Sequence, residues 1–101
     1  LMDMKDPISI EPLIARLSDP ILSVRELAVE TIGKIKSREA VEPLIELIQG
    51  AEKEIKMAGV KALAAIGDKR AEAMLLAIIN NPQEDPGIKK EAALGLGELE
   101  F

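Results

Sequence analysis

Apolar residues recur at helical spacing in two successive segments of the chain. In the second segment they fall at positions i, i+3, i+4, i+8 and i+11, namely Val24, Leu27, Ala28, Ile32 and Ile35. These positions lie on one face of an α-helix. Residues 10–17 keep the same spacing over two turns. The pattern therefore predicts one short helix, a connection and a second, longer helix.

The same two-helix pattern occurs three times. Residues 41–48 repeat the apolar positions of residues 10–17 at an offset of 31, and this offset continues through the next helix. A third copy starts at the same offset, which then becomes 33 because two residues have been added within residues 80–87. That segment is rich in Asn, Pro and Gly, as in a surface loop. We therefore expect first helices within 9–17, 38–48 and 69–79, and second helices within 24–36, 55–66 and 88–99.

Several residues bear on where these helices begin. Ser23 and Glu26 have the spacing of a capping box, whereas Asp19 followed by Pro20 is a competing start. Asp85 with Pro86 gives the equivalent signal in the third copy. Two further prolines, Pro12 and Pro43, fit only in a first helical turn, where the backbone N–H has no helical partner.

The composition supports packed helices in one domain of 101 residues. Hydrophobic residues make up 48% of the chain, yet Phe101 is its only aromatic residue, so Leu, Ile, Val, Ala and Met must form the core. Strand-based folds usually draw on aromatic residues. We divide the chain into repeats at about 8–37, 38–68 and 69–101, which makes it a single domain or a fragment of a longer array.

Three features of the composition bear on the compartment and partners. The lack of Cys favours a cytoplasmic protein without disulfides. The apolar runs are shorter than the roughly 18 residues of a membrane span, so no membrane partner is expected. The net charge of −5 argues against nucleic-acid binding, which depends on Lys and Arg to neutralise phosphates.

Residues 24–35, 55–68 and 88–99 resemble the second helix of HEAT repeats. The likeness is greatest to the short HEAT-like repeats of bilin lyases, and it covers residues 8–100. Asp19 and the basic residue Arg25 also match the habit of that family. The resemblance implies an all-α, armadillo-like fold, a right-handed α-α superhelix of three helix-turn-helix repeats. It says little about function, because such solenoids bind many unrelated partners.

Small residues recur at equivalent positions of the predicted second helices. Glycine inside a helix costs roughly 1 kcal/mol relative to alanine, so its presence indicates a neighbouring helix at close range. We predict such close approaches at two sets of aligned positions, namely Ala28, Gly59 and Ala92, and Gly33, Ala64 and Gly97.

A ladder of cations, Arg25, Lys56 and Lys89, also aligns along the repeats. We expect these cations to pair with acidic loop residues such as Asp19, Glu54 or Asp85. The alternative is a row that binds anions.

Catalytic chemistry has few candidates in this sequence. His, Cys and Tyr are absent, which removes the usual general base, the usual metal ligands and most nucleophiles. Carboxylates spaced four residues apart, as in Glu42 with Glu46 and Glu26 with Glu30, are common on solvated helices. We therefore predict no enzyme, no cofactor, and no catalytic or metal-binding residue. A bilin-lyase-like enzyme subunit is the remote alternative.

The expected function is a scaffold that binds a protein or peptide partner. The three predicted second helices hold seven Lys or Arg and four Glu. In HEAT-like stacks these helices line the concave side, so the resemblance implies a mildly basic binding face. The candidate contact residues are Arg25, Glu26, Glu30, Lys34, Met57, Lys61, Lys90 and Leu94. Charge reversal at Lys61 and Lys90 is expected to weaken binding of the partner.

The last predicted helix ends in an apolar surface instead of the polar cap that usually closes a solenoid. Its members are Leu94, Leu96, Leu99 and Phe101. We expect this end to meet further repeats or to self-associate. A structural or oligomerising segment of a larger regulatory protein is therefore the second functional hypothesis.

Overall fold

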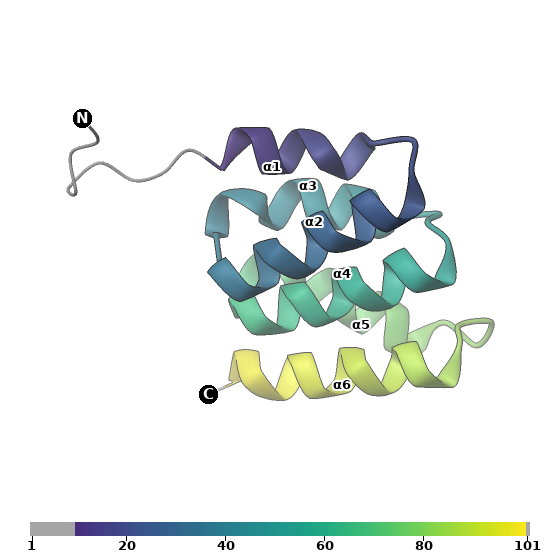
Figure 1. The fold of residues 1–101 in the computed structure, drawn as a ribbon. Helices are drawn as coiled ribbons and strands as arrows, with labels where there is room; N and C mark the ends of the chain where they lie inside the picture. Colours follow the sequence, from purple (N-terminus) through teal and green to yellow (C-terminus); the bar gives the residue numbers. More distant parts are fainter. Residues whose placement is uncertain (1–9, 101) are drawn as a thin grey trace.

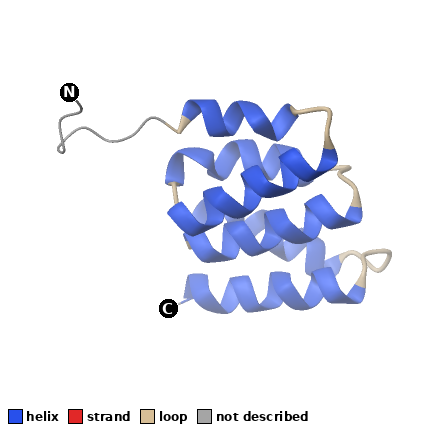
Figure 2. Cartoon of the chain, viewed as in Figure 1, coloured by secondary structure: helices blue, strands red, loops and turns tan. Residues whose placement is uncertain are grey.

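A computed structural model describes residues 10–100, and side chains up to Leu99. These residues form three successive helix pairs and contain no strand (Figure 2). The first helix of each pair joins a short 3-10 turn. The bounds are α1 Glu11–Ala15 with η1 Arg16–Ser18, α2 Leu22–Ile35, η2 Arg38–Ala40 with α3 Val41–Ile48, α4 Lys53–Ile66, η3 Lys69–Ala71 with α5 Glu72–Asn80, and α6 Pro86–Glu100. The predicted all-α solenoid is confirmed.

The helices lie in two layers (Figure 1). Helices α2, α4 and α6 lie side by side and run in the same direction, while α1, α3 and α5 form the second layer. Most of the apolar face that each helix shows in the sequence points between the layers. The prediction fails for Leu27 and Ile35 of α2, which are 64% and 58% exposed. The largest fully buried side chains come from both layers, namely Ile32, Leu44, Ile48, Ile55, Leu63, Leu75 and Ile88. Each such burial stabilises the fold by roughly 1.5–3 kcal/mol.

The helix starts agree with part of the sequence prediction. Pro86 opens α6, and the Asp85 carboxylate Oδ1 accepts hydrogen bonds from the N–H groups of Gly87 (2.7 Å) and Ile88 (3.3 Å). Pro12 and Pro43 both lie in a first α-helical turn, as predicted. The two extra residues of the third repeat fall in the loop between α5 and α6 (Figure 1).

The predicted capping box of α2 is wrong. The helix already begins at Leu22, after Ile21, so Ser23 lies within its first turn and makes no capping hydrogen bond. The Asp19 carboxylate accepts instead from the N–H of Ile21 at 2.9 Å and shapes the turn before the helix.

The prediction of close helix approaches is confirmed at two glycines. A Cβ atom added at Gly33 would stand 3.1 Å from Cα of Ala62, and one added at Gly59 would stand 2.2 Å from Cγ2 of Ile48. The prediction is wrong at Gly97, where such an atom would meet nothing within 4 Å among the described residues. In α6 the close contact is made by Gly95, against Ala64.

Candidate functional site

A groove of roughly 500 Å³ runs between α2 and α4 on the layer of second helices. Its apolar lining consists of Gly33, Met57, Ala58, Ala62 and Ala65. Six charged residues also line it, three acidic and three basic, namely Glu26, Glu30, Glu54, Lys34, Lys36 and Lys61. We call this feature the α2–α4 groove.

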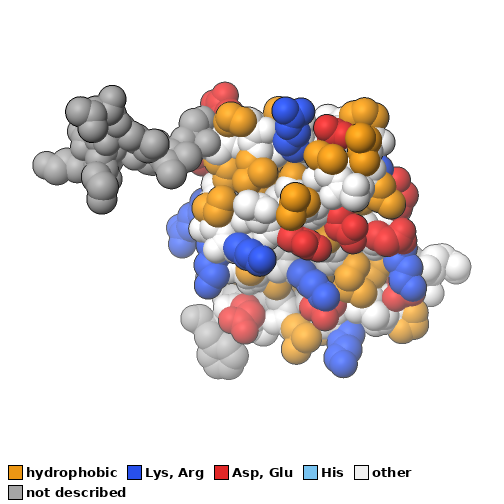
Figure 3. All heavy atoms as spheres, viewed as in Figure 1, with side chains coloured by type: hydrophobic (Ala, Val, Ile, Leu, Met, Phe, Trp, Pro, Cys, Tyr) orange, Lys and Arg blue, Asp and Glu red, His pale blue; other side chains and the backbone are white. Residues whose placement is uncertain are grey.

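The charges of the α2–α4 groove are separated along its length. Glu26 and Glu54 lie near the beginnings of α2 and α4, whereas Lys34 and Lys36 lie at the end of α2. Figure 3 shows acidic side chains to the right, over the start of these helices, and basic side chains to the left, beside their ends. Negative charge at a helix start and positive charge at its end also suit the helix dipole. The groove therefore has an acidic end and a basic end above an apolar lining.

The charged groups of the α2–α4 groove are not joined to one another. Glu30 and Lys61 occupy equivalent positions of adjacent helices, yet no ion pair within 4 Å joins a groove carboxylate to a groove lysine in residues 10–99. Their hydrogen-bonding capacity is open to solvent and to a partner. Charged groups of this kind add orientation and specificity to binding more than raw affinity.

Five of the eight predicted contact residues line this one groove. They are Glu26, Glu30, Lys34, Met57 and Lys61. Lys90 and Leu94 lie on α6 and are exposed, but they stand outside the groove. Lys36, Glu54 and the small lining residues were not among the predicted contact residues. One of these, Ala65, lies 31 residues after Lys34, so the repeat offset alone could have identified it.

The remaining predicted contact residue, Arg25, is occupied within the protein. Its Nη2 atom lies 2.9 Å from Oε2 of Glu52. The pKa of Glu52 is lowered, mainly by a hydrogen bond from its own backbone N–H and further by Arg25. Arg25 therefore joins α2 to the start of α4.

The next cation of the ladder also pairs with an acidic residue that precedes the following second helix. Lys56 of α4 pairs with Glu84, in the loop before α6. Beside it, Nζ of Lys53 lies 2.9 Å from Oδ2 of Asp85, and this hydrogen bond raises the pKa of Lys53 and lowers that of Asp85. Pairing with acidic loop residues was predicted correctly for the first two cations of the ladder.

The individual ladder partners differ from those predicted, because each acid comes from the following repeat. Glu52 and Glu84 take the places expected for Asp19 and Glu54. The third cation, Lys89, has no ion pair in the described part of the chain.

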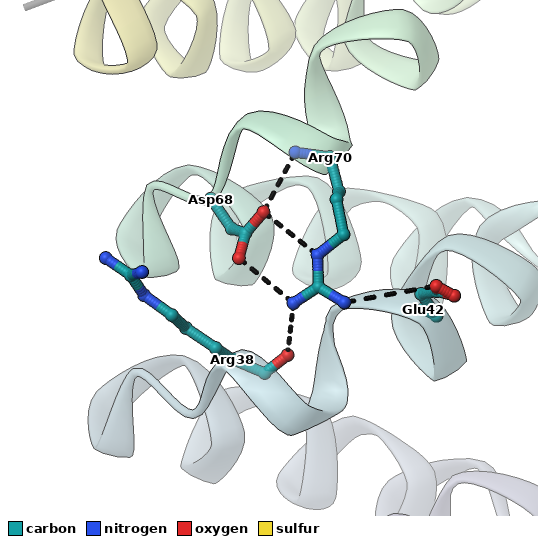
Figure 4. A network of polar contacts seen from close by, with 4 residues as sticks. All are labelled: Arg38, Glu42, Asp68 and Arg70. Atoms are coloured by element: carbon teal, nitrogen blue, oxygen red, sulfur yellow. Dashed lines mark hydrogen bonds and ion pairs between the residues drawn. The ribbon is translucent and has the colours of Figure 1, made fainter.

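A second polar cluster lies at the 3-10 turns of the other layer (Figure 4). Arg70 binds the Asp68 carboxylate through Nε (3.1 Å) and Nη2 (3.0 Å), and Nη2 also donates to the carbonyl oxygen of Arg38 at 2.9 Å. The Asp68 carboxylate accepts from the backbone N–H of Arg70, and Arg70 Nη1 lies 3.9 Å from Glu42. The hydrogen bonds from Arg70 lower the pKa of Asp68 to about 2. This cluster links the third repeat to the second through polar contacts.

A groove of roughly 570 Å³ borders that cluster. Its lining includes Glu42, Glu46 and Arg70, and the Arg70 guanidinium is already engaged by Asp68 and Arg38. Glu42 and Glu46 are the carboxylate pair noted in the sequence, and no group of three or more potential metal ligands occurs within residues 10–99. We therefore regard the α2–α4 groove, whose charges are unpaired, as the better binding site.

Comparisons with known proteins bear on the family. A sequence model described as HEAT repeats matches residues 10–97. A search of curated proteins finds no match. In the described part of the chain, each helix is too short or too polar to cross a membrane.

Proposed function

Because the chain belongs to the HEAT-repeat family, whose members generally mediate contacts between proteins, we propose that it is a non-catalytic scaffold that binds a protein segment in the α2–α4 groove. The observation that carries this proposal is the combination of an apolar lining with unpaired carboxylates at one end and unpaired ammonium groups at the other.

The groove chemistry favours an amphipathic segment as the partner. Apolar side chains of such a segment would cover Met57, Ala58 and Ala65, and this burial supplies affinity. A basic end would lie over Glu26 and Glu54, and an acidic end over Lys34 and Lys36. The charges would set the direction of the bound segment, since the reversed direction places like charges together.

The test uses a synthetic helical peptide with one apolar stripe, Lys residues at one end and Glu residues at the other. We call it the charge-segregated peptide. A peptide of the same composition with the charges scrambled along its length is the first control. Isothermal titration calorimetry is expected to show about tenfold tighter binding of the charge-segregated peptide, a difference that shrinks at high salt.

Two matched protein variants test whether the peptide binds in the groove. Lys61→Glu reverses a groove charge, whereas Lys69→Glu makes the same change at an exposed residue of η3 outside the groove. We expect the first variant to weaken binding several-fold and the second to leave it unchanged. Equal effects of the two variants, or no preference for the charge-segregated peptide, would refute the proposal.

A further inference from the structure

Successive repeats meet through the same positions twice within this chain. Gly33 of α2 faces Ala62 of α4, with 3.1 Å from its added Cβ to Cα of Ala62. One repeat later, Ala64 of α4 faces Gly95 of α6, with 3.0 Å between Ala64 Cβ and an added Cβ at Gly95. By the offsets of 31 and 33, Ala64 corresponds to Gly33, and Gly95 corresponds to Ala62. The second helices therefore have one side that receives the next repeat and another that covers the previous one.

The receiving side is open on α6. Gly97 corresponds to Gly33 and Ala64, and nothing in the described residues lies within 4 Å of an added Cβ there. Ala93 is exposed, although Val29 and Val60 at the equivalent positions are fully buried. In the neighbouring α5, Leu76 is 43% exposed. This surface, formed by Leu76, Ala93 and Gly97, is half of a repeat interface, and we call it the α6 end face.

The structure corrects the apolar end predicted from sequence. Leu99 is only 5% exposed and belongs to the core, and Phe101 lies outside the described residues. Leu94 is 57% exposed but aligns with Lys61, a residue of the α2–α4 groove, so it lies on the face of the second helices. Leu96 is partly buried against the core.

In the part of the chain that the structure describes, the complementary half is open on α2. Thr31 corresponds to Ala62 and Gly95, the two residues that cover the previous repeat, and it is partly exposed. Leu27 aligns with Ala58, which packs against the core, yet Leu27 is 64% exposed. Ile21, at the start of the same helix, is 58% exposed. We call the surface of Ile21, Leu27 and Thr31 the α2 end face.

Ion pairs also mark the interfaces between successive repeats. In the two internal interfaces, Arg25 pairs with Glu52, and Lys56 pairs with Glu84, each acid standing just before the next second helix. Lys89 is the equivalent cation on the α6 end face and has no ion pair among the described residues. On the α2 end face, Asp19 is the acid just before the helix, but its carboxylate already lies 3.7 Å from Nη1 of Arg16 and accepts from the N–H of Ile21.

We propose that the α6 end face binds the α2 end face of a second copy of this chain, so that copies stack head to tail and continue the repeat spacing. Thr31 of one copy would then cover Gly97 of the other, as Ala62 covers Gly33 within the chain. Such an interface is heterologous, and it grows into open-ended oligomers because every added copy presents a new free face. This self-association goes beyond partner binding in the groove and leaves the α2–α4 groove accessible.

Sedimentation velocity of the full chain over a concentration series tests this proposal. Thr31→Arg blocks the α2 end face, and Gly97→Lys blocks the α6 end face at a position with space for a side chain. We expect wild type to form progressively larger species, and each variant alone to associate about tenfold more weakly. Ala65→Lys, which places the same charge on α4 within the groove, is the matched control and should associate like wild type.

Mixing the two blocked variants tests whether the copies stack head to tail or pair symmetrically. Each retains the face that the other lacks, so an equimolar mixture should form a dimer and nothing larger at concentrations where neither variant associates alone. A wild type that remains monomeric at every concentration overturns the proposal. Self-association of Thr31→Arg as strong as that of wild type also overturns it, because α6 would then pair symmetrically with another α6. Circular dichroism of each variant verifies that it is folded.

Discussion

Gly59 of α4 lies against Ile48 of α3 so closely that a Cβ atom at Gly59 would stand 2.2 Å from Cγ2 of Ile48. Ile48 is fully buried and belongs to the core. The side chain of Ile48 therefore occupies the volume that any larger residue at position 59 would need. This contact sets how closely the two helices of the second repeat approach each other.

Replacement of this glycine by alanine is expected to destabilise the protein. Overpacking of a core costs about 1–3 kcal/mol, which outweighs the roughly 1 kcal/mol that alanine gains over glycine in a helix. Urea unfolding of Gly59→Ala should show a lower free energy of unfolding than wild type. The matched control is Gly97→Ala, which has free space around the added methyl group and should be as stable as wild type or more so. Equal stability of the two variants would contradict the packing argument.

A second prediction concerns the residue that ends α2. Lys36 adopts left-handed backbone angles, with φ 60° and ψ 43°, and its equivalent at the end of α4 is Gly67, with φ 70°. Non-glycine residues pay about 1 kcal/mol in this conformation. Lys36→Gly should therefore raise the free energy of unfolding by about 0.5–1 kcal/mol, and Gly67→Lys should lower it by a similar amount. Thermal unfolding of the reciprocal pair checks this, and a loss of stability in Lys36→Gly would refute it.

A third prediction concerns acid stability. Hydrogen bonds from Arg70 lower the pKa of Asp68 to about 2, below its usual value of 3.8. Since the folded-state pKa is the lower one, the carboxylate stabilises the fold fully above about pH 4 and loses this contribution as the pH falls toward 2. Asp68→Asn should be less stable than wild type at neutral pH, and the difference should shrink across that window. A carbon-detected NMR titration that gave Asp68 an ordinary pKa would contradict the arrangement in Figure 4.

Much of the fold could be predicted from the sequence because each repeat carries its own helical pattern. The 31-residue offset identified the layer of second helices, and the Asn-Pro-Gly composition of residues 80–87 located the inserted loop. The start of α2 could not be predicted, because Asp19 uses its carboxylate on Ile21 and leaves the helix without a side-chain cap.

The predictions about pairs of residues in different helices were less accurate. Neighbouring parallel helices touch through different sides, so equivalent residues do not meet. Gly33 contacts Ala62, which belongs to neither set of aligned small residues, and the Arg25 partner is Glu52 in the following loop. Such pairings depend on the rotation and stagger between helices. Five of the predicted contact residues line the α2–α4 groove because they share one exposed face, which the helical spacing alone defines.

The central claim is that the α2–α4 groove binds an amphipathic segment in one direction set by its two charged ends. A nitroxide label on the acidic end of the charge-segregated peptide reports this direction through paramagnetic broadening of protein amide signals. We predict broadening around Lys34 and Lys36, and its transfer to the region of Glu26 and Glu54 in a variant whose groove charges are exchanged. That variant carries Glu26→Lys, Glu54→Lys, Lys34→Glu and Lys36→Glu. Equal broadening at both ends of the groove, or broadening that stays in place after the exchange, would contradict the claim.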